Sequence, residues 1–157
     1  MKMFLISMMV MFVTINLVRA DKVLDANILA RTIYREARKD GAQGMQAVAC
    51  VIEQRSDERH MSLSAVCLQR AKKKGVWVCQ FTCWCKATAQ DKQFKALPND
   101  PEAVYAQALA ESMVAGKRLD HSVVKFANHY CALDCFPDWA EGQIPVAIIG
   151  GHKFFKL

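Results

Sequence analysis

The sequence has little glycine and proline, seven and four residues in a chain of 157. This scarcity excludes a collagen-like or low-complexity chain, and a hydrophobic content of 53% argues against intrinsic disorder. The length is too small for a multi-domain enzyme or a polytopic membrane protein and suits one domain with a substantial core. No Walker, dinucleotide-binding or G-x-S-x-G motif occurs, which disfavours nucleotide chemistry and serine hydrolases of that type.

The first twenty residues differ in kind from the rest. Lys2 precedes an apolar run over residues 3–18, and residues 18–20 (VRA) have the spacing of a signal-peptidase site. We therefore predict a secretory signal peptide over residues 1–20, cleaved before Asp21, and one exported domain over residues 21–157. An uncleaved signal anchor is the alternative, although the run is short for a span of about 20 residues. Contact with a membrane is expected only through that segment.

The charge surplus of the chain is mild. Lys2 and Arg19 lie in the leader, so 19 of the 21 basic residues remain beyond it, against 15 acidic ones. The surplus suits an anionic polymer of the cell envelope. No concentrated basic stripe occurs, so a nucleic-acid partner is not expected. The one cluster, residues 72–74 (KKK), is typical of a solvated loop.

Seven cysteines lie beyond the leader, which in an oxidising compartment predicts disulfides. Six of them allow three bridges with one thiol left over, and their pairing stays open, with Cys79–Cys85, or either of these with Cys67, as guesses. The spacing lacks the repeated C-x2-C of common zinc modules, so no metal is expected. The cysteines are Cys50, Cys67, Cys79, Cys83, Cys85, Cys131 and Cys135.

Apolar spacing predicts a helix over residues 25–39, with Asp25 as its N-cap and Gly41 as its stop. A second helix is predicted over residues 43–57, with Cys50 placed opposite its apolar face. A crosslink to another element is favoured for this cysteine, and a second buried face of the helix is the alternative. A short third helix is predicted to open at Ser62 or Ser64.

The last predicted helix starts at residues 100–102 (DPE), an N-cap followed by proline, and ends at Gly116. Residues 71–98 show no clean period and are predicted to form a functional loop pinned by disulfides. Residues 123–127 are predicted to be extended, and residues 145–149 and 153–157 to pair as a hairpin. The fold class expected is mainly α (α+β), with a small C-terminal β hairpin.

Glu36 is the one acidic residue with an unusual position. On a helical wheel it lies at the border of the apolar stripe that contains Ile33. Partial desolvation there raises the pKa of a carboxyl group toward the range of a general acid, which glycosidic cleavage requires. No second carboxylate is evident, and a single acid/base suffices when a hydroxyl group of the sugar attacks internally. The alternative is an ordinary pairing of Glu36 with a nearby arginine.

A Cys–His nucleophile is a weaker candidate. Cys131 follows His129 closely, as in an amidase or cysteine peptidase, but a disulfide is the commoner fate of such a cysteine.

Several segments in order resemble the SleB-type cell wall hydrolase family. The family patterns are Y-x-E-A-R, then G-x-x-A-V-A-x-V-I-x-N-R, V-C, C-Q-F-S, A-T-H-Y, P-x-W and I-G-x-H-x-F-Y. Each alone is weak, whereas together they are specific. The matching segments are residues 33–38 (IYREAR), 44–55 (GMQAVACVIEQR), 66–67 (VC), 79–85 (CQFTCWC), 127–130 (ANHY), 137–139 (PDW) and 149–155 (IGGHKFF).

The resemblance implies a lysozyme-like fold and action on the glycan strand of peptidoglycan. It also implies that Glu36, the glutamate of Y-x-E-A-R, is the catalytic acid/base of a lytic transglycosylase that needs no cofactor. We further expect the protein to be a monomer. In that chemistry the 6-hydroxyl of muramic acid closes an anhydro ring. Hydrolysis as a muramidase or glucosaminidase, with a second acid such as Glu53, and a non-catalytic envelope-binding protein are the alternatives.

Further roles follow from the same resemblance. Gln80, Thr82, His129 and Tyr130 are expected to position the substrate, and Arg55 to orient Glu36 or to bind a carboxylate of the stem peptide. Trp84 and Trp139 are candidates for stacking on sugars, although a buried tryptophan is commoner.

Three positions depart from the family pattern, namely Gln54 for Asn, Asn128 for Thr and Phe155 for Tyr. These departures affect the details of substrate binding more than the reaction class. Cys83, Cys131 and Cys135 add to the pattern and are expected to form bridges of their own.

Overall fold

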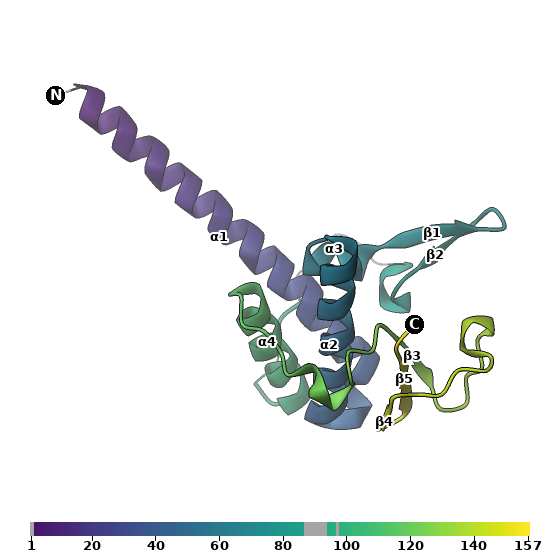
Figure 1. Cartoon of the computed structure of the whole chain (residues 1–157). Coiled ribbons are helices and arrows are strands. Elements are labelled where there is room, and N and C mark those ends of the chain that lie inside the picture. Colours follow the sequence, from purple (N-terminus) through teal and green to yellow (C-terminus); the bar gives the residue numbers. More distant parts are fainter. Residues whose placement is uncertain (1, 87–93, 97) are drawn as a thin grey trace.

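The computed structural model describes residues 2–86, 94–96 and 98–157, and side chains from residue 20 onward. Helix α1 (Lys2–Ala37) packs its second half against α2 (Gly41–Arg59), α3 (Leu63–Leu68) and α4 (Pro101–Val114), while its first half projects away from them (Figure 1). The mainly helical α+β class is confirmed. In the described part of the chain, no helix has the length and hydropathy of a membrane span.

The predicted start of the first helix is wrong, because α1 runs through Asp25 without a break, so this residue caps nothing. Its end is close to the prediction. Ala37 is followed by a 3-10 turn over Arg38–Asp40, and Gly41 has a φ of 64°, which starts α2 in a new direction. Glu36 therefore lies in the last turn of α1, at a corner.

The second helix is longer than predicted and is buried on two faces. One face joins α1, α3 and α4 in a core that includes Ile33, Val48 and Ile52. The other face packs on the C-terminal sheet through Val51 and Phe154. The prediction that Cys50 forms a crosslink is wrong, since it is a free thiol buried on this second face.

Helices α3 and α4 begin as their sequences predict. Ser62 is the N-cap of α3, and its hydroxyl accepts a hydrogen bond from the Ala65 amide at 3.2 Å. Asp100 is the N-cap of α4, where its Oδ1 accepts from the Ala103 amide at 2.9 Å, and Pro101 is the first helical residue.

Residues 71–98 contain a β-hairpin that sequence analysis missed. Strand β1 (Arg70–Lys73) pairs antiparallel with β2 (Val76–Cys79) around a two-residue turn, in which Lys74 and Gly75 have φ of 47° and 83°. The hairpin extends away from the helices (Figure 1), so seven of its eight strand residues are exposed. Burial therefore imposes no alternation on its sequence. The rest of the predicted loop falls partly on residues 87–93 and 97, which lie outside the described residues.

One disulfide is present, Cys79–Cys85, as one of the guesses had it. The expectation of three bridges is wrong, because the other five cysteines are free. Cys131 illustrates the reason. Its thiol donates to the backbone carbonyl of Cys135 at 3.5 Å instead of bonding to the Cys135 sulfur.

The C-terminal part forms a three-stranded antiparallel sheet of order β3-β5-β4, from β3 (His129–Ala132), β4 (Ala147–Ile149) and β5 (His152–Phe155). The predicted terminal hairpin is confirmed as β4–β5, and β3 is an additional strand. Residues 123–127 are not extended, because Lys125 and Phe126 adopt left-handed conformations after a 3-10 turn over His121–Val123. After this turn the chain returns to α2, where Arg55 donates to the backbone carbonyl of Asn128.

Candidate active site

The carboxyl group of Glu36 is partly buried where α1 ends against strand β3. Its Oε2 accepts a hydrogen bond from the hydroxyl of Tyr130 at 3.0 Å. Burial raises the pKa of Glu36, while the Tyr130 hydrogen bond and the charges of His152 and Arg55 act in the opposite direction with smaller effect. A proton on this carboxyl group therefore persists to higher pH than on an exposed glutamate, as a general acid requires.

Tyr130 is held by aromatic neighbours. Its ring stacks on Phe154 at a centroid distance of 5.7 Å and meets the ring of His152 edge-on at 5.4 Å. Burial, followed by the nearby Glu36 carboxylate, raises the pKa of Tyr130 well above its ordinary value. The phenol therefore keeps its proton at neutral pH and remains a hydrogen-bond donor to Glu36.

Arg55 lies beneath the site and is 4% exposed. Its Nε donates to the backbone carbonyl of Asn128 at 2.6 Å, and its guanidinium lies 5.9 Å from the ring of Phe81. Burial lowers the pKa of Arg55 to about 10, so the group remains a cation at neutral pH. Arg55 acts on Glu36 through its charge, and its burial removes it from contact with a carboxylate of a stem peptide.

Asn128, at a position where the family usually has threonine, ties the chain end to α2. Its Nδ2 donates to both carboxylate oxygens of Glu58, at 3.2 and 3.1 Å, and to the Leu157 carbonyl at 2.9 Å. Its Oδ1 accepts from the Leu157 amide at 3.0 Å and from Nδ1 of His129 at 2.9 Å. We call these contacts the Asn128 clasp. Sequence reasoning missed them because their partners lie far apart in the chain.

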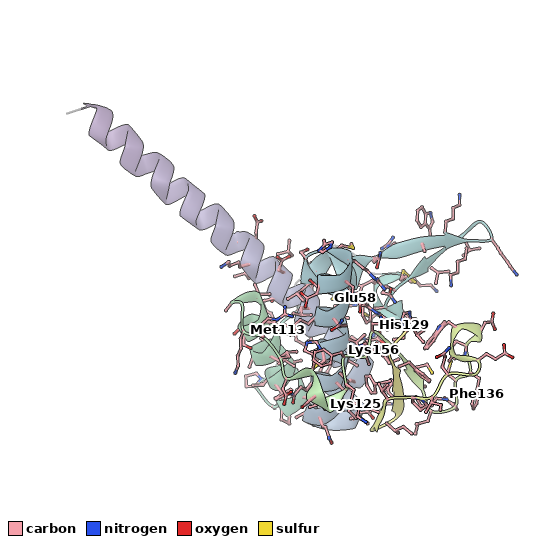
Figure 2. The ribbon with its side chains drawn as sticks, in the orientation of Figure 1. Glu58, Met113, Lys125, His129, Phe136 and Lys156 are labelled. Carbon is pink, nitrogen blue, oxygen red and sulfur yellow. A yellow bond between two sulfur atoms is a disulfide. The ribbon has the colours of Figure 1, made fainter. Side chains whose placement is uncertain are left out.

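His129 is half-buried beside the clasp, next to Glu58 (Figure 2). Burial, followed by the charges of Arg55 and Arg59, lowers the pKa of His129, so its ring is neutral at pH 7. The ring lies 5.0 Å from that of Trp139, which is 37% exposed. An exposed indole beside a neutral imidazole suits a sugar face.

The other tryptophan candidate belongs to the core. Trp84 is 1% exposed, and its Nε1 donates to the hydroxyl of Thr32 at 2.8 Å.

Gln80 and Thr82 lie at the base of the hairpin, just past the end of β2. Gln80 accepts a hydrogen bond at its Oε1 from Nη1 of Arg59 at 3.2 Å. Thr82 is exposed at the start of a 3-10 turn (Thr82–Trp84). The next residue, Cys83, has its pKa raised to about 11 by burial and then by the charge of Glu36. The turn therefore runs close to Glu36.

The structure thus brings most predicted residues together. Glu36 and Tyr130 are in direct contact, and Arg55 lies below them. His129 is the neighbour of Tyr130 on β3. Gln80 joins this group only through Arg59, and Thr82 only through its neighbour in the chain.

Asp40 and His152 form a second pair at the site that sequence reasoning did not assign. His152 Nδ1 lies 2.7 Å from Oδ2 of Asp40, while Oδ1 accepts from the Gly151 amide at 2.8 Å. A Cβ at Gly44 or Gly150 would collide with the Asp40 side chain, so both positions require glycine. The sequence shows a histidine that follows two glycines and an aspartate at a helix junction, but it does not show that the two meet.

Glu53, the alternative second acid, is engaged elsewhere. It is 3% exposed, and its Oε2 lies 2.7 Å from Nε2 of His121 and accepts from the Leu119 amide at 3.2 Å. This buried pair has no room for a substrate. No group of three or more His, Cys, Asp or Glu suited to a metal ion occurs among the described residues.

Comparison with known proteins gives one match. A family model described as Cell Wall Hydrolase matches residues 39–155, a span that contains Arg55, Gln80, His129 and Tyr130 and begins just past Glu36. No curated protein and no solved structure matches the chain.

Proposed function

Because the chain belongs to the SleB-type cell wall hydrolase family, whose substrate is peptidoglycan, we propose that it cleaves the glycan strand with Glu36 as its acid and base. The observation that carries this proposal is the contact of Glu36 with Tyr130 at 3.0 Å, at a carboxyl group whose pKa is raised by burial. Such a group holds a proton for the leaving oxygen of a glycosidic bond.

The reaction proposed is that of a lytic transglycosylase. Protonated Glu36 donates its proton to the glycosidic oxygen as the bond to the anomeric carbon breaks. The carboxylate then takes the proton of the muramic acid 6-hydroxyl, whose oxygen bonds to the same carbon and closes a 1,6-anhydro ring. Glu36 ends protonated, and no water is consumed.

The engagement of Glu53 with His121 supports this route over hydrolysis. Hydrolysis normally uses a second carboxylate as base or nucleophile. The candidate that the sequence offered, Glu53, is buried with its Oε2 at 2.7 Å from Nε2 of His121. A single carboxyl group suits a reaction whose nucleophile belongs to the substrate.

The family favours a location in the cell envelope or outside the cell. We propose that residues 1–20 direct the export. The intact mass of the exported protein tests this step, because cleavage before Asp21 removes a defined mass.

The substitution Glu36→Gln tests the catalytic assignment. We expect the variant to lose at least about a hundredfold of the activity on purified sacculi while its thermal midpoint does not fall. Mass spectrometry of the wild-type products gives anhydro-muramic ends for a transglycosylase and reducing ends for a hydrolase. Unchanged lysis by Glu36→Gln would refute the catalytic role, and absence of any cleavage by the folded wild type would favour an envelope-binding protein.

A further inference from the structure

A cavity of about 320 Å³ lies where the β1–β2 hairpin leaves the body of the protein. Three cationic side chains line it, those of Arg59, Arg70 and Lys73, together with the amides of Gln69 and Gln80. The rest of its lining is apolar, and no carboxylate contributes to it. Its composition suits an anion.

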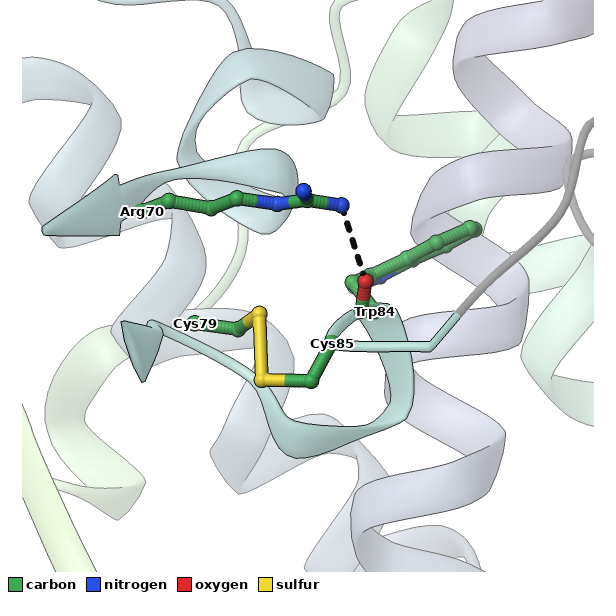
Figure 3. The surroundings of a disulfide bond; sticks show 4 residues. All are labelled: Arg70, Cys79, Trp84 and Cys85. Atoms are coloured by element: carbon green, nitrogen blue, oxygen red, sulfur yellow. Dashed lines mark hydrogen bonds between the residues drawn. A yellow bond between two sulfur atoms is a disulfide. The ribbon is translucent and has the colours of Figure 1, made fainter. Parts of the chain in front are cut away.

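The shape of this cavity is fixed by covalent and hydrogen bonds at the base of the hairpin (Figure 3). Cys79, which lines the cavity, is joined to Cys85 by the disulfide. Arg70 Nη2 donates to the Trp84 carbonyl at 3.0 Å, and the Gln80 amide donates to the Gln69 carbonyl at 2.8 Å. A ligand therefore meets a preformed site, which lowers the entropic cost of binding.

No acidic side chain in the lining neutralises the positive charge of the cavity. Arg59 donates from Nη1 to the side-chain oxygens of Gln69 and Gln80, which are neutral acceptors. Among the residues that the structure describes, no ion pair of Arg59, Arg70 or Lys73 with a carboxylate is found. Guanidinium groups with N–H donors directed at one space bind carboxylates and phosphates well.

The cavity adjoins the candidate active site. Gln80 lines it and is also one of the predicted positioning residues. The charge of Arg59 lowers the pKa of His129, so the two groups lie close together. An anion in the cavity would therefore lie next to a polymer that occupies the candidate site.

We propose that this cavity binds a carboxylate of the stem peptide attached to muramic acid. The inference rests on the proposed function, which places the glycan strand beside Glu36 and His129. It transfers to Arg59, Arg70 and Lys73 the role that the sequence suggested for the buried Arg55. Recognition of the peptide would select glycan that still carries its peptides over bare glycan.

Lys73→Glu tests the proposal, with Lys72→Glu as the matched control. The two lysines are adjacent on β1 and face opposite sides of the hairpin, so both variants change the net charge equally while only Lys73 lines the cavity. On peptide-bearing glycan we expect Lys73→Glu to raise KM about fivefold with kcat unchanged. On glycan freed of peptides by an amidase, and for Lys72→Glu on either polymer, we expect no change.

Equal effects of the two variants, or an equal effect of Lys73→Glu on both polymers, would overturn the proposal. Calorimetric titration with a soluble stem tetrapeptide keeps the test independent of turnover. Binding by the wild type that Lys73→Glu weakens supports the cavity even if neither polymer is cleaved, in which case only the proposed function fails. If the peptide does not bind, or if inorganic phosphate binds more tightly than the peptide, the proposal that the cavity binds a stem peptide is overturned.

Discussion

Tyr130 and Glu36 are 94 residues apart in the sequence, yet the phenol of one donates to the carboxylate of the other at 3.0 Å. This bond joins strand β3 to the last turn of α1. The carboxyl group is thereby oriented by the C-terminal sheet, and its protonation depends on that sheet being in place.

Tyr130→Phe is expected to shift the pH profile of cleavage. The hydrogen bond from Tyr130 favours the carboxylate, so its loss raises the pKa of Glu36 further. In the proposed mechanism the active form is protonated Glu36, and the alkaline limb of kcat/KM should therefore move to higher pH. The maximal kcat/KM should fall about tenfold because the carboxyl group loses its orientation. Measurement of initial rates from pH 4 to 9 checks this.

Tyr34→Phe is the control for that profile. Tyr34 lies on α1, as Glu36 does. Like Tyr130, it donates its hydroxyl hydrogen to a carboxylate, that of Asp100, at 2.6 Å. Its loss should leave the alkaline limb in place. A shift of equal size in both variants, or a shift to lower pH in Tyr130→Phe, would contradict the role assigned to Tyr130.

Glu36→Gln is expected to stabilise the protein at neutral pH. The pKa of Glu36 is raised by burial in the folded state, so the folded state holds the proton more tightly than the unfolded chain. The contribution of this proton to stability is present below the unfolded pKa, near 4.5, and is lost as the pH rises through the folded pKa. The variant should therefore melt higher than the wild type at pH 7, and this gain should disappear at pH 4. A gain present only at acidic pH would show the sign to be wrong.

Glu53→Gln separates a structural role from a catalytic one. We expect a loss of about 2 kcal/mol in the free energy of unfolding, because the buried His121 loses a charged partner. Activity per folded molecule should stay unchanged. Asp57→Asn, at an exposed ion pair with Arg118, should cost less than about 1 kcal/mol. Loss of activity in a folded Glu53→Gln protein would instead favour the hydrolytic mechanism.

The disulfide is expected to make a modest contribution to the free energy of unfolding, because the loop that it closes is short. Cys79 and Cys85 are six residues apart, for which loop-closure entropy gives about 2 kcal/mol. Cys79→Ala combined with Cys85→Ala should lower the free energy of unfolding by that amount, whereas Cys135→Ala, at an exposed free thiol, should have little effect. Alkylation of the denatured, unreduced protein should label five cysteines, and a lower count would indicate further bridges.

Elements with local signals could be predicted from the sequence. The N-caps Ser62 and Asp100 are satisfied by backbone amides only three residues away, so their signal is contained in a short window. Glu36 was identified from its position on one helical wheel for the same reason. The β1–β2 hairpin gave no such signal, because its strands are exposed on both sides. Phe126 adopts a left-handed conformation that its neighbours in the sequence do not predict.

Contacts across long distances in the chain could not be predicted. His152 and Asp40 are 112 residues apart, and Asn128 meets Arg55 across 73 residues. A single sequence specifies each of these residues but not which of the many polar groups it will meet. The resemblance to a family indicated which residues are candidates for the site. The packing of the sheet on α2 determines which of these residues lie together.

The Asn128 clasp has a practical consequence for work with this protein. Leu157 is hydrogen-bonded on both its amide and its carbonyl to one side chain, directly next to His129. Residues that follow Leu157, such as an affinity tag, would therefore emerge next to His129, which we propose to position the glycan. Rates measured with such a tag in place should be compared with rates measured after its removal.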